Sequence, residues 1–232
     1  MCGRFAQVLK HTELKKMQDE LKMIENSEQI EFNYNLAPTQ TVAAVVEKGE
    51  LRYPGFFRWG LVPSWMKELP ASAIINVRSE TITEKPSFKA SFIRRRALVP
   101  ANGFYEWRQS DKQPFFIHAI AEPLIYIAAI YDTWCGADGS YLPSLAIITT
   151  AADDFMQPLH HRMPLLISAE NCNAWLDTKL QDLRQISPML ITAHPTQLAM
   201  YPVSKRVNNI RNNDPECYQE IALEQVQSDM FS

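Results

Sequence analysis

The sequence predicts an α+β fold in which a few helices flank a curved, largely antiparallel, barrel-like β-sheet. Short apolar segments rich in β-branched and aromatic residues recur along most of the chain, which is typical of strands. Only a few segments have apolar residues at helical spacing. No internal repeat, low-complexity tract or Gly/Ser linker interrupts the chain, so we expect residues 1–232 to form a single domain.

The expected strands are short and follow one another closely. They cover residues 41–46, 51–59, 73–77, 97–100, 104–108, 114–119, 124–130 and 144–150. Pro54 has no N–H to donate to a neighbouring strand, so the segment 51–59 is expected at an edge or a bulge. The segments 124–130 and 144–150 are almost continuously apolar and are expected at the centre of the sheet.

Three segments have helical character. Leu14, Met17, Leu21 and Ile24 predict a helix over 13–24, with Thr12 as its N-cap. A second helix is expected to begin with Pro86 at its first position, where a missing N–H costs nothing, and to run into Arg94-Arg95-Arg96. A third covers 168–176 behind a capping Ser168.

Composition excludes several classes of protein. No segment approaches the roughly 20 apolar residues of a membrane span, and the polar start does not resemble a signal peptide. The four cysteines, Cys2, Cys135, Cys172 and Cys217, contain no CxxC pair. We therefore expect free thiols, no structural metal and a cytoplasmic location.

Net charge does not indicate a nucleic-acid binder, because it is −3 at pH 7. Any contact with DNA must come from a local basic cluster. Two clusters stand out, Arg94-Arg95-Arg96 and Lys205-Arg206 with Arg211. A solvated surface and a nucleic-acid contact remain equally good interpretations of both.

Cys2 is the residue with the most distinctive chemistry. Methionine aminopeptidases remove Met1 when the second residue is small, and removal leaves an α-amine of pKa ~7.7–8.0 beside a thiol of pKa ~8.5. An aldehyde that meets this 1,2-aminothiol forms an imine with the amine, and the thiol then closes a thiazolidine ring. No internal residue has a free α-amine. The alternative is a cysteine that follows the start by chance.

Three further segments place polar groups in apolar surroundings. They are 74–81, with Asn76 and Arg78 on one face of an extended chain, 98–107, with Glu106 between aromatic residues, and 159–165, with His160 and Arg162. Each alone is consistent with a structural role. Their joint presence in one chain favours a reactive site.

These segments, together with the start of the chain, resemble the SRAP family (SOS response-associated peptidases), whose members process abasic sites. The resemblance extends over nearly the full length. It rests on 1–5 (MCGRF), 34–38 (YNLAP), 59–65 (WGLVPSW), 76–81 (NVRSET), 100–107 (PANGFYEW), 149–152 (TTAA), 160–164 (HHRMP), 202–204 (PVS) and 207–208 (VN). Their order and spacing together make a chance match very improbable.

The resemblance implies a reactive set of Cys2, Asn76, Glu106 and His160. Cys2 would supply both nucleophiles, and Asn76 would hold the opened sugar. Glu106 would move protons to and from the α-amine, and its aromatic setting suits a raised carboxyl pKa. His160 would help to open the deoxyribose ring and protonate the departing oxygen.

The resemblance also implies a surface for single-stranded DNA. Arg4, Arg78 and Arg162 would bind phosphates, because guanidinium donors match phosphate oxygens in pairs. Pro38 and Trp65 would form an apolar wedge that unstacks neighbouring bases. The same reading implies a monomer without cofactor or metal, nucleoid-associated when bound to DNA.

The expected activity is covalent, lyase-like capture of abasic sites in single-stranded DNA, which shields the lesion. Two alternatives stay open. The first is a cysteine peptidase with Cys2 as nucleophile and His160 as base, including removal of its own Met1. The second is a module that binds single-stranded DNA without a covalent bond.

Overall fold

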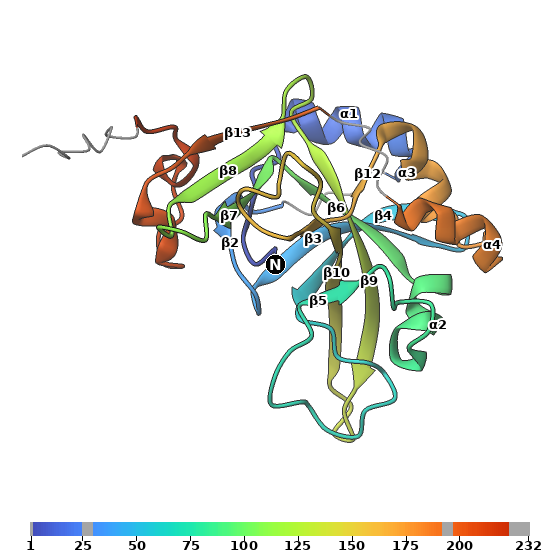
Figure 1. Cartoon of the computed structure of the whole chain (residues 1–232). Coiled ribbons are helices and arrows are strands. Elements are labelled where there is room, and N and C mark those ends of the chain that lie inside the picture. The colour runs from blue at the N-terminus through green and yellow to red at the C-terminus, as the bar shows by residue number, and fades with distance from the viewer. Residues whose placement is uncertain (1, 25–29, 192–196, 223–232) are drawn as a thin grey trace, which may run out of the picture.

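The computed structural model describes residues 2–24, 30–191 and 197–222, whose strands form two sheets (Figure 1). The first sheet has the order β13 (Leu198–Pro202), β8 (Pro114–Ala119), β7 (Gly103–Trp107), β1 (Phe5–Gln7) and β2 (Asn33–Leu36). The second has the order β11 (Arg162–Pro164), β10 (Tyr141–Ala151), β4 (Leu51–Trp59), β3 (Thr41–Lys48), β6 (Arg96–Ala101), β9 (Ile125–Cys135) and β12 (Leu166–Ile167), with β5 (Asn76–Arg78) also paired to β10.

Nearly all of these strands run antiparallel, as the sequence predicts. Among the strands of the described residues, the parallel pairs are β10 with β4 and β10 with β5. The fold class is therefore confirmed: a mixed fold, mostly antiparallel, with flanking helices. No helix in this part of the chain is both long and apolar enough to span a membrane.

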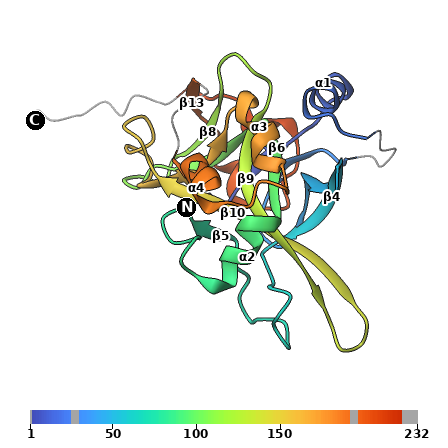
Figure 2. The ribbon, with the colours of Figure 1, turned by 90° about the vertical axis from the view of Figure 1, so that its right-hand side faces the viewer.

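Two apolar clusters lie on either side of the second sheet. One joins side chains of both sheets, such as Phe104 and Ile117 from the first and Val99 and Ile127 from the second. The other lies on the opposite face of the second sheet, where helices cover it. Figure 2 looks onto this face and shows α2 (Pro86–Arg94), α3 (Ala169–Leu176) and α4 (Leu183–Ile186) in front of the strands.

The expected helices form, but their ends differ from the prediction. The first, α1, covers His11–Leu21, so the N-cap is Lys10 rather than Thr12, and the helix stops before Ile24. Lys22 ends it in a left-handed conformation with φ 52°. Pro86 opens α2 as predicted. Ser168 is the N-cap of α3, but its hydroxyl makes no capping bond.

The strand predictions hold best where the apolar pattern is longest. The segments 124–130 and 144–150 belong to β9 and β10, which pair with each other as a long hairpin. Pro54 pairs with Val45 of β3 on one side. On the other side β10 pairs with β4 only at Arg58 and Trp59, so Pro54 lies on a part of β4 that β10 does not cover, as expected. The predicted strand 73–77 is instead β5, which begins at Asn76. The short strands β1, β2 and β13 and the 3₁₀ turns Ser187–Leu190, Lys205–Asn208 and Pro215–Tyr218 were not anticipated.

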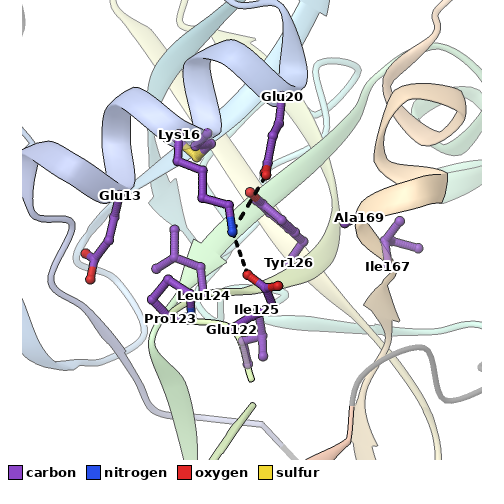
Figure 3. Close-up of a pocket in the computed structure, with 11 residues that line it drawn as sticks. Glu13, Lys16, Glu20, Glu122, Pro123, Leu124, Ile125, Tyr126, Ile167 and Ala169 are labelled. Carbon is purple, nitrogen blue, oxygen red and sulfur yellow. Dashed lines mark hydrogen bonds and ion pairs between the residues drawn. The ribbon is translucent and has the colours of Figure 1, made fainter. Parts of the chain in front are cut away.

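Helix α1 packs beside the start of β9 (Figure 3). Met17 and Leu21 are its buried residues and belong to the second apolar cluster. Lys16 bridges Glu122 at 2.7 Å and Glu20 at 3.7 Å above a small cavity of about 70 Å³. All three charged groups are about half exposed, so this bridge adds little to stability.

The first basic cluster is largely used within the fold, whereas Lys205 and Arg211 of the second are exposed. Arg96 is buried, Arg95 forms an ion pair with Asp132, and only Arg94 of that triplet is exposed. Arg206 likewise pairs with Asp214 at 2.6 Å. Two of the three guanidinium groups of Arg94-Arg95-Arg96 are therefore used within the fold, and a nucleic-acid contact of the exposed Arg94 stays a prediction.

Arg96 joins the helices to the second sheet. It is 2% exposed, and its guanidinium donates to the carbonyl oxygens of Trp175, Phe92, Ile93, Asp177 and Leu180 at 2.5 to 3.1 Å. These carbonyls lie at or beyond the C-terminal ends of α2 and α3, where helix oxygens lack partners within the helix. One side chain thus satisfies the ends of two helices.

We expect Arg96→Met to lower the free energy of unfolding by about 3 kcal/mol, because five buried carbonyls lose a charged donor. The matched control is Arg94→Met, which alters an exposed neighbour and should change stability by less than about 0.5 kcal/mol. Urea unfolding at pH 7 measures both. Equal stability of the two variants would show that Arg96 does not hold the helix ends.

Candidate active site

The first strand of the chain is an inner strand of the first sheet. Strand β1 pairs with β7 on one side, where Phe5 faces Phe104, and with β2 on the other, where Phe5 faces Leu36. Phe5 and Cys2 have no exposed surface and belong to the cluster between the two sheets. The segment from Cys2 to Phe5 therefore belongs to the core of the fold.

Two amide side chains, Gln7, which is buried, and Asn102, which is half-buried, hold this segment in place. Gln7 donates to the carbonyls of Ala43 and Pro100 at 2.8 and 2.9 Å and accepts from the Ala43 N–H at 2.9 Å. Asn102 accepts from the Val8 N–H at 2.7 Å and donates to the Val8 carbonyl at 3.2 Å. These bonds tie β1 to the second sheet as well as to its own, which leaves Cys2 little freedom of position.

Asn76 contacts Cys2 directly. It begins β5, which lies parallel to β10 with Asn76 opposite Ile147. Its Nδ2 donates to the Cys2 carbonyl oxygen at 2.8 Å. Its Oδ1 is buried and accepts no hydrogen bond from the described residues. A buried acceptor without a partner is costly in a structural role, and it suits a site that receives a donor from a ligand.

Glu106 lies on β7 and is 5% exposed. Burial raises its pKa from 4.5 to about 7. Burial, and next the charge of Glu106, raise the pKa of the Cys2 thiol from 9.0 to about 12. The carboxyl and the thiol therefore lie close enough to influence each other. At neutral pH the thiol is protonated, while Glu106 is close to half ionised.

His160 lies in the segment that connects β10 to β11. Met156 and Leu159 of this segment pack into the cluster that contains Cys2. The His160 Nδ1 accepts from the Arg162 N–H at 2.9 Å, so the neutral ring carries its proton on Nε2. Burial lowers the pKa of His160. The ring stacks on His161 with centroids 4.3 Å apart.

The three expected phosphate-binding arginines differ in availability. Arg78 is exposed at the end of β5, and no hydrogen bond or ion pair joins its side chain to another described residue. Arg162 lies opposite Ala151 of β10 and is 9% exposed. Its guanidinium forms a two-pronged ion pair with Glu80 and donates to the Thr149 carbonyl at 2.6 Å.

Arg4 is half-buried between the first sheet and the 3₁₀ turn at Lys205–Asn208. It donates to Asn35 Oδ1 and to the Val207 carbonyl, both at 2.6 Å, and its guanidinium lies 5.8 Å from the Trp107 ring centre. Its Nε is buried and has no partner among the described residues. Arg4 is therefore bonded within the fold through its Nη1, while its Nε–H has no acceptor among the described residues.

The expected wedge residues lie outside the reactive set. Pro38 is half-buried in the turn between β2 and β3. Trp65 is 66% exposed, in the connection between β4 and β5. The fold thus brings Cys2, Asn76 and Glu106 together and packs the His160 segment against the same cluster, but it gives no bond from these groups to Pro38 or Trp65.

Several site residues were not singled out from the sequence. Glu80 neutralises Arg162, Asn35 anchors Arg4, and Gln7 and Asn102 hold the first strand. Glu80, Asn35 and Asn102 lie inside motifs that the sequence analysis quoted, so their place in a motif was the available signal. Gln7 carries no such signal, since a glutamine in an apolar segment does not reveal its burial.

No three His, Cys, Asp or Glu side chains of the described residues meet in a way that would hold a metal ion. The four cysteines are free thiols, and all but Cys135 are buried. The small cavity beside α1 (Figure 3) shares no residue with the site around Cys2.

Comparisons with known proteins identify the class to which this fold and site belong. The sequence model of the family described as SOS response associated peptidase (SRAP) matches residues 1–210. The chain belongs to this family.

Two curated relatives have informative names. "Abasic site processing protein YoqW" of Bacillus subtilis is 33% identical over 93% of this chain and 98% of its own length. "Abasic site processing protein HMCES" of Gallus gallus is 35% identical over 72% of this chain and 57% of its own length. A crystal structure of a protein from Bacteroides thetaiotaomicron matches 95% of this chain and all of that chain with a TM-score of 0.81 at 24% identity, which shows the shared fold.

The buried carboxyl of Glu106 makes stability depend on pH. Its pKa is about 7 in the folded chain and 4.5 ordinarily, so the folded state binds more protons between these values. The free energy of unfolding therefore falls as pH rises through this window, by at most about 3 kcal/mol from this group. In Glu106→Gln this contribution is absent. The free energy of unfolding of the variant should therefore rise relative to that of the wild type as the pH increases from 4.5 to 8. Urea unfolding across this range tests the sign, and parallel curves for both proteins would contradict it.

Proposed function

We propose that this chain processes abasic sites in single-stranded DNA by bonding them covalently to Cys2 once Met1 has been removed. The observation that carries the proposal is the placement of Cys2, which is buried beside Glu106 and hydrogen-bonded to Asn76 through its carbonyl. Membership of a family whose curated relatives are named abasic site processing proteins gives the substrate class.

The proposed reaction joins two nucleophiles of one residue to one carbonyl carbon. The ring-opened deoxyribose presents an aldehyde, and the Cys2 α-amine adds to it and loses water to give an imine. The thiol then adds to the imine carbon, and its proton moves to the nitrogen. One C–N bond and one C–S bond form, one water leaves, and no oxidant or reductant is required. The five-membered thiazolidine ring makes the adduct durable.

The neighbouring groups suit the proton transfers in this sequence. Glu106, with a pKa of about 7, accepts a proton from the ammonium form of the amine and returns it to the departing hydroxyl. Neutral His160 carries its proton on Nε2 and would donate it to the departing oxygen as the sugar ring opens. Asn76 Oδ1 accepts a hydrogen bond from the sugar, since it has no partner among the described residues.

The DNA strand would be held mainly by backbone contacts. Arg78 is exposed and ready to bind a phosphate, and Arg4 has an unused Nε donor. Arg162 would bind a phosphate by exchanging it for the carboxylate of Glu80, whose side chain is 47% exposed. Trp65 and Pro38 would stack against or separate the flanking bases.

A cysteine peptidase is the less favoured alternative. A peptidase would use the thiol of Cys2 alone and would gain nothing from the α-amine that removal of Met1 exposes. Removal of Met1 by the chain itself would be a separate reaction. It would cleave the peptide bond that precedes Cys2 in the same chain, so it needs no second molecule as substrate. Non-covalent binding of single-stranded DNA would leave the α-amine and the thiol of Cys2 unused.

Cys2→Ala should abolish the adduct that survives denaturing electrophoresis, because an alanine amine forms only a hydrolysable imine. Treatment with borohydride should recover the crosslink in this variant, since reduction traps the imine. Cys172→Ala is the matched control, because this buried cysteine lies in the other apolar cluster. A durable adduct of Cys2→Ala without borohydride would rule out the thiazolidine.

Arg78→Ala should weaken binding of abasic and intact single strands alike, since phosphates carry no information about the lesion. The slope of log affinity against log salt should flatten by roughly 0.7 for the lost contact. Arg162→Ala should also destabilise the fold, because Glu80 and Thr149 lose their partner, whereas Arg78→Ala should leave unfolding unchanged. An unchanged salt slope for Arg78→Ala would exclude it from the phosphate path.

A further inference from the structure

The connection between β4 and β5 carries Trp65 away from the body of the fold. It lies alongside the long β9–β10 hairpin at the bottom of Figure 1. Residues 62–75 contain no helix and no strand of the two sheets, yet Trp65 in their midst is 66% exposed. A large indole on an irregular loop ordinarily samples many positions, which costs entropy when it binds.

The backbone on each side of Trp65 is nevertheless bonded to the hairpin. The Ser64 N–H donates to Asp132 Oδ2 at 2.9 Å. The Met66 carbonyl accepts from Trp134 Nε1 at 2.8 Å. Asp132 and Trp134 both lie on β9, two residues apart. The two bonds fix the residues that flank Trp65 and leave its own side chain unused.

Asp132 is itself firmly held. It is 5% exposed, and its Oδ1 accepts from the Thr133 N–H at 2.9 Å. Arg95 approaches Oδ2 at 3.3 Å and also donates to the Tyr131 carbonyl and to Ser91 Oγ, at 3.2 and 3.0 Å. The anchor of the loop therefore extends through Arg95 to helix α2.

The two ends of the same loop lie close together. Gly60 has φ 139°, and a Cβ there would lie 2.6 Å from the Cβ of Ala73, so only glycine fits where the two ends of the loop meet. The Val62 N–H donates to Ser144 Oγ on β10 at 2.9 Å. The loop is closed at its base and fastened near Trp65, so its irregular backbone is still well determined.

We infer that Asp132 and Trp134 are positioning residues that hold Trp65 as a preformed stacking surface for a base of the bound single strand. The inference rests on the proposed function, which supplies the strand. Stacking on an aromatic side chain contributes most when the ring is already in place, because no loop entropy is lost on binding. Neither residue touches the DNA in this account, and both act through the backbone of Ser64 and Met66.

A double-mutant cycle with an intact single-stranded oligonucleotide separates positioning from general stability. Trp65→Ala should weaken binding at least fivefold, as expected for one lost stacked base. Trp134→Phe keeps an aromatic ring but loses the bond to Met66, and it should weaken binding about threefold to tenfold. In the Trp65→Ala background, Trp134→Phe should have no further effect. An equal loss in both backgrounds would overturn the inference.

Trp175→Phe is the matched control. It too removes one indole N–H bond to a backbone carbonyl, that of Ala97 at 2.9 Å, in a helix remote from Trp65. Its binding should equal that of the wild type. A loss of affinity as large as that of Trp134→Phe would attribute both effects to stability and would also overturn the inference.

Hydrogen exchange of the free protein tests the anchor without DNA. In Asp132→Ala, both carboxylate oxygens are lost, so the Ser64 N–H has no side-chain acceptor and should exchange at least about fivefold faster. Asp138→Ala, at the exposed tip of the same hairpin, should leave that amide unchanged. Unchanged exchange at Ser64 in Asp132→Ala would overturn the role of Asp132.

The two proposals fail in different ways. If the wild type forms no durable adduct with abasic DNA while the cycle still shows coupling, the covalent capture fails and the positioning of Trp65 stands. If Trp65→Ala binds the oligonucleotide like the wild type, the stacking role is overturned, and the exposed indole would serve another partner, such as a protein. That result would not contradict the proposed covalent capture by Cys2.

Discussion

The site depends on the insertion of the first strand between two others. Pairing of β1 with β7 and β2 places Cys2 in the apolar cluster between the two sheets, close to Asn76 and Glu106. A chain terminus ordinarily frays, but here the side chains of Gln7 and Asn102 add bonds that a three-residue strand lacks. The backbone nitrogen and the thiol of Cys2 are therefore held in one fixed position.

Burial of this terminus also sets the protonation states around it. The same exclusion of water raises the pKa of the Cys2 thiol and of Glu106 and lowers that of His160. A protonated thiol is a poor nucleophile towards most carbonyls, which protects it from adventitious reactions. In the proposed reaction, Glu106 would relay the thiol proton to the imine nitrogen as the sulfur adds to the imine carbon.

Much of the fold could be predicted from the sequence because its longer strands are apolar throughout, as in β9 and β10. The short strands β1, β2 and β13 could not, since three to five residues carry no recognisable period. The same limit applied to the arginine triplet, because residue type does not reveal that Arg96 caps two helices from inside the core. At the site, motif resemblance indicated Arg162, but its pairing with Glu80 depends on how β10 brings two distant segments together.

Separation of chains by intact mass gives the most direct test of the central claim, because the reactive amine exists only in chains that begin at Cys2. Met1-free and Met1-retaining pools are each incubated with abasic single-stranded DNA and resolved by denaturing electrophoresis. The account predicts durable adducts from the Met1-free pool at once, and from the other pool only as methionine is lost. Equal and immediate adduct formation by chains that retain Met1 would contradict it.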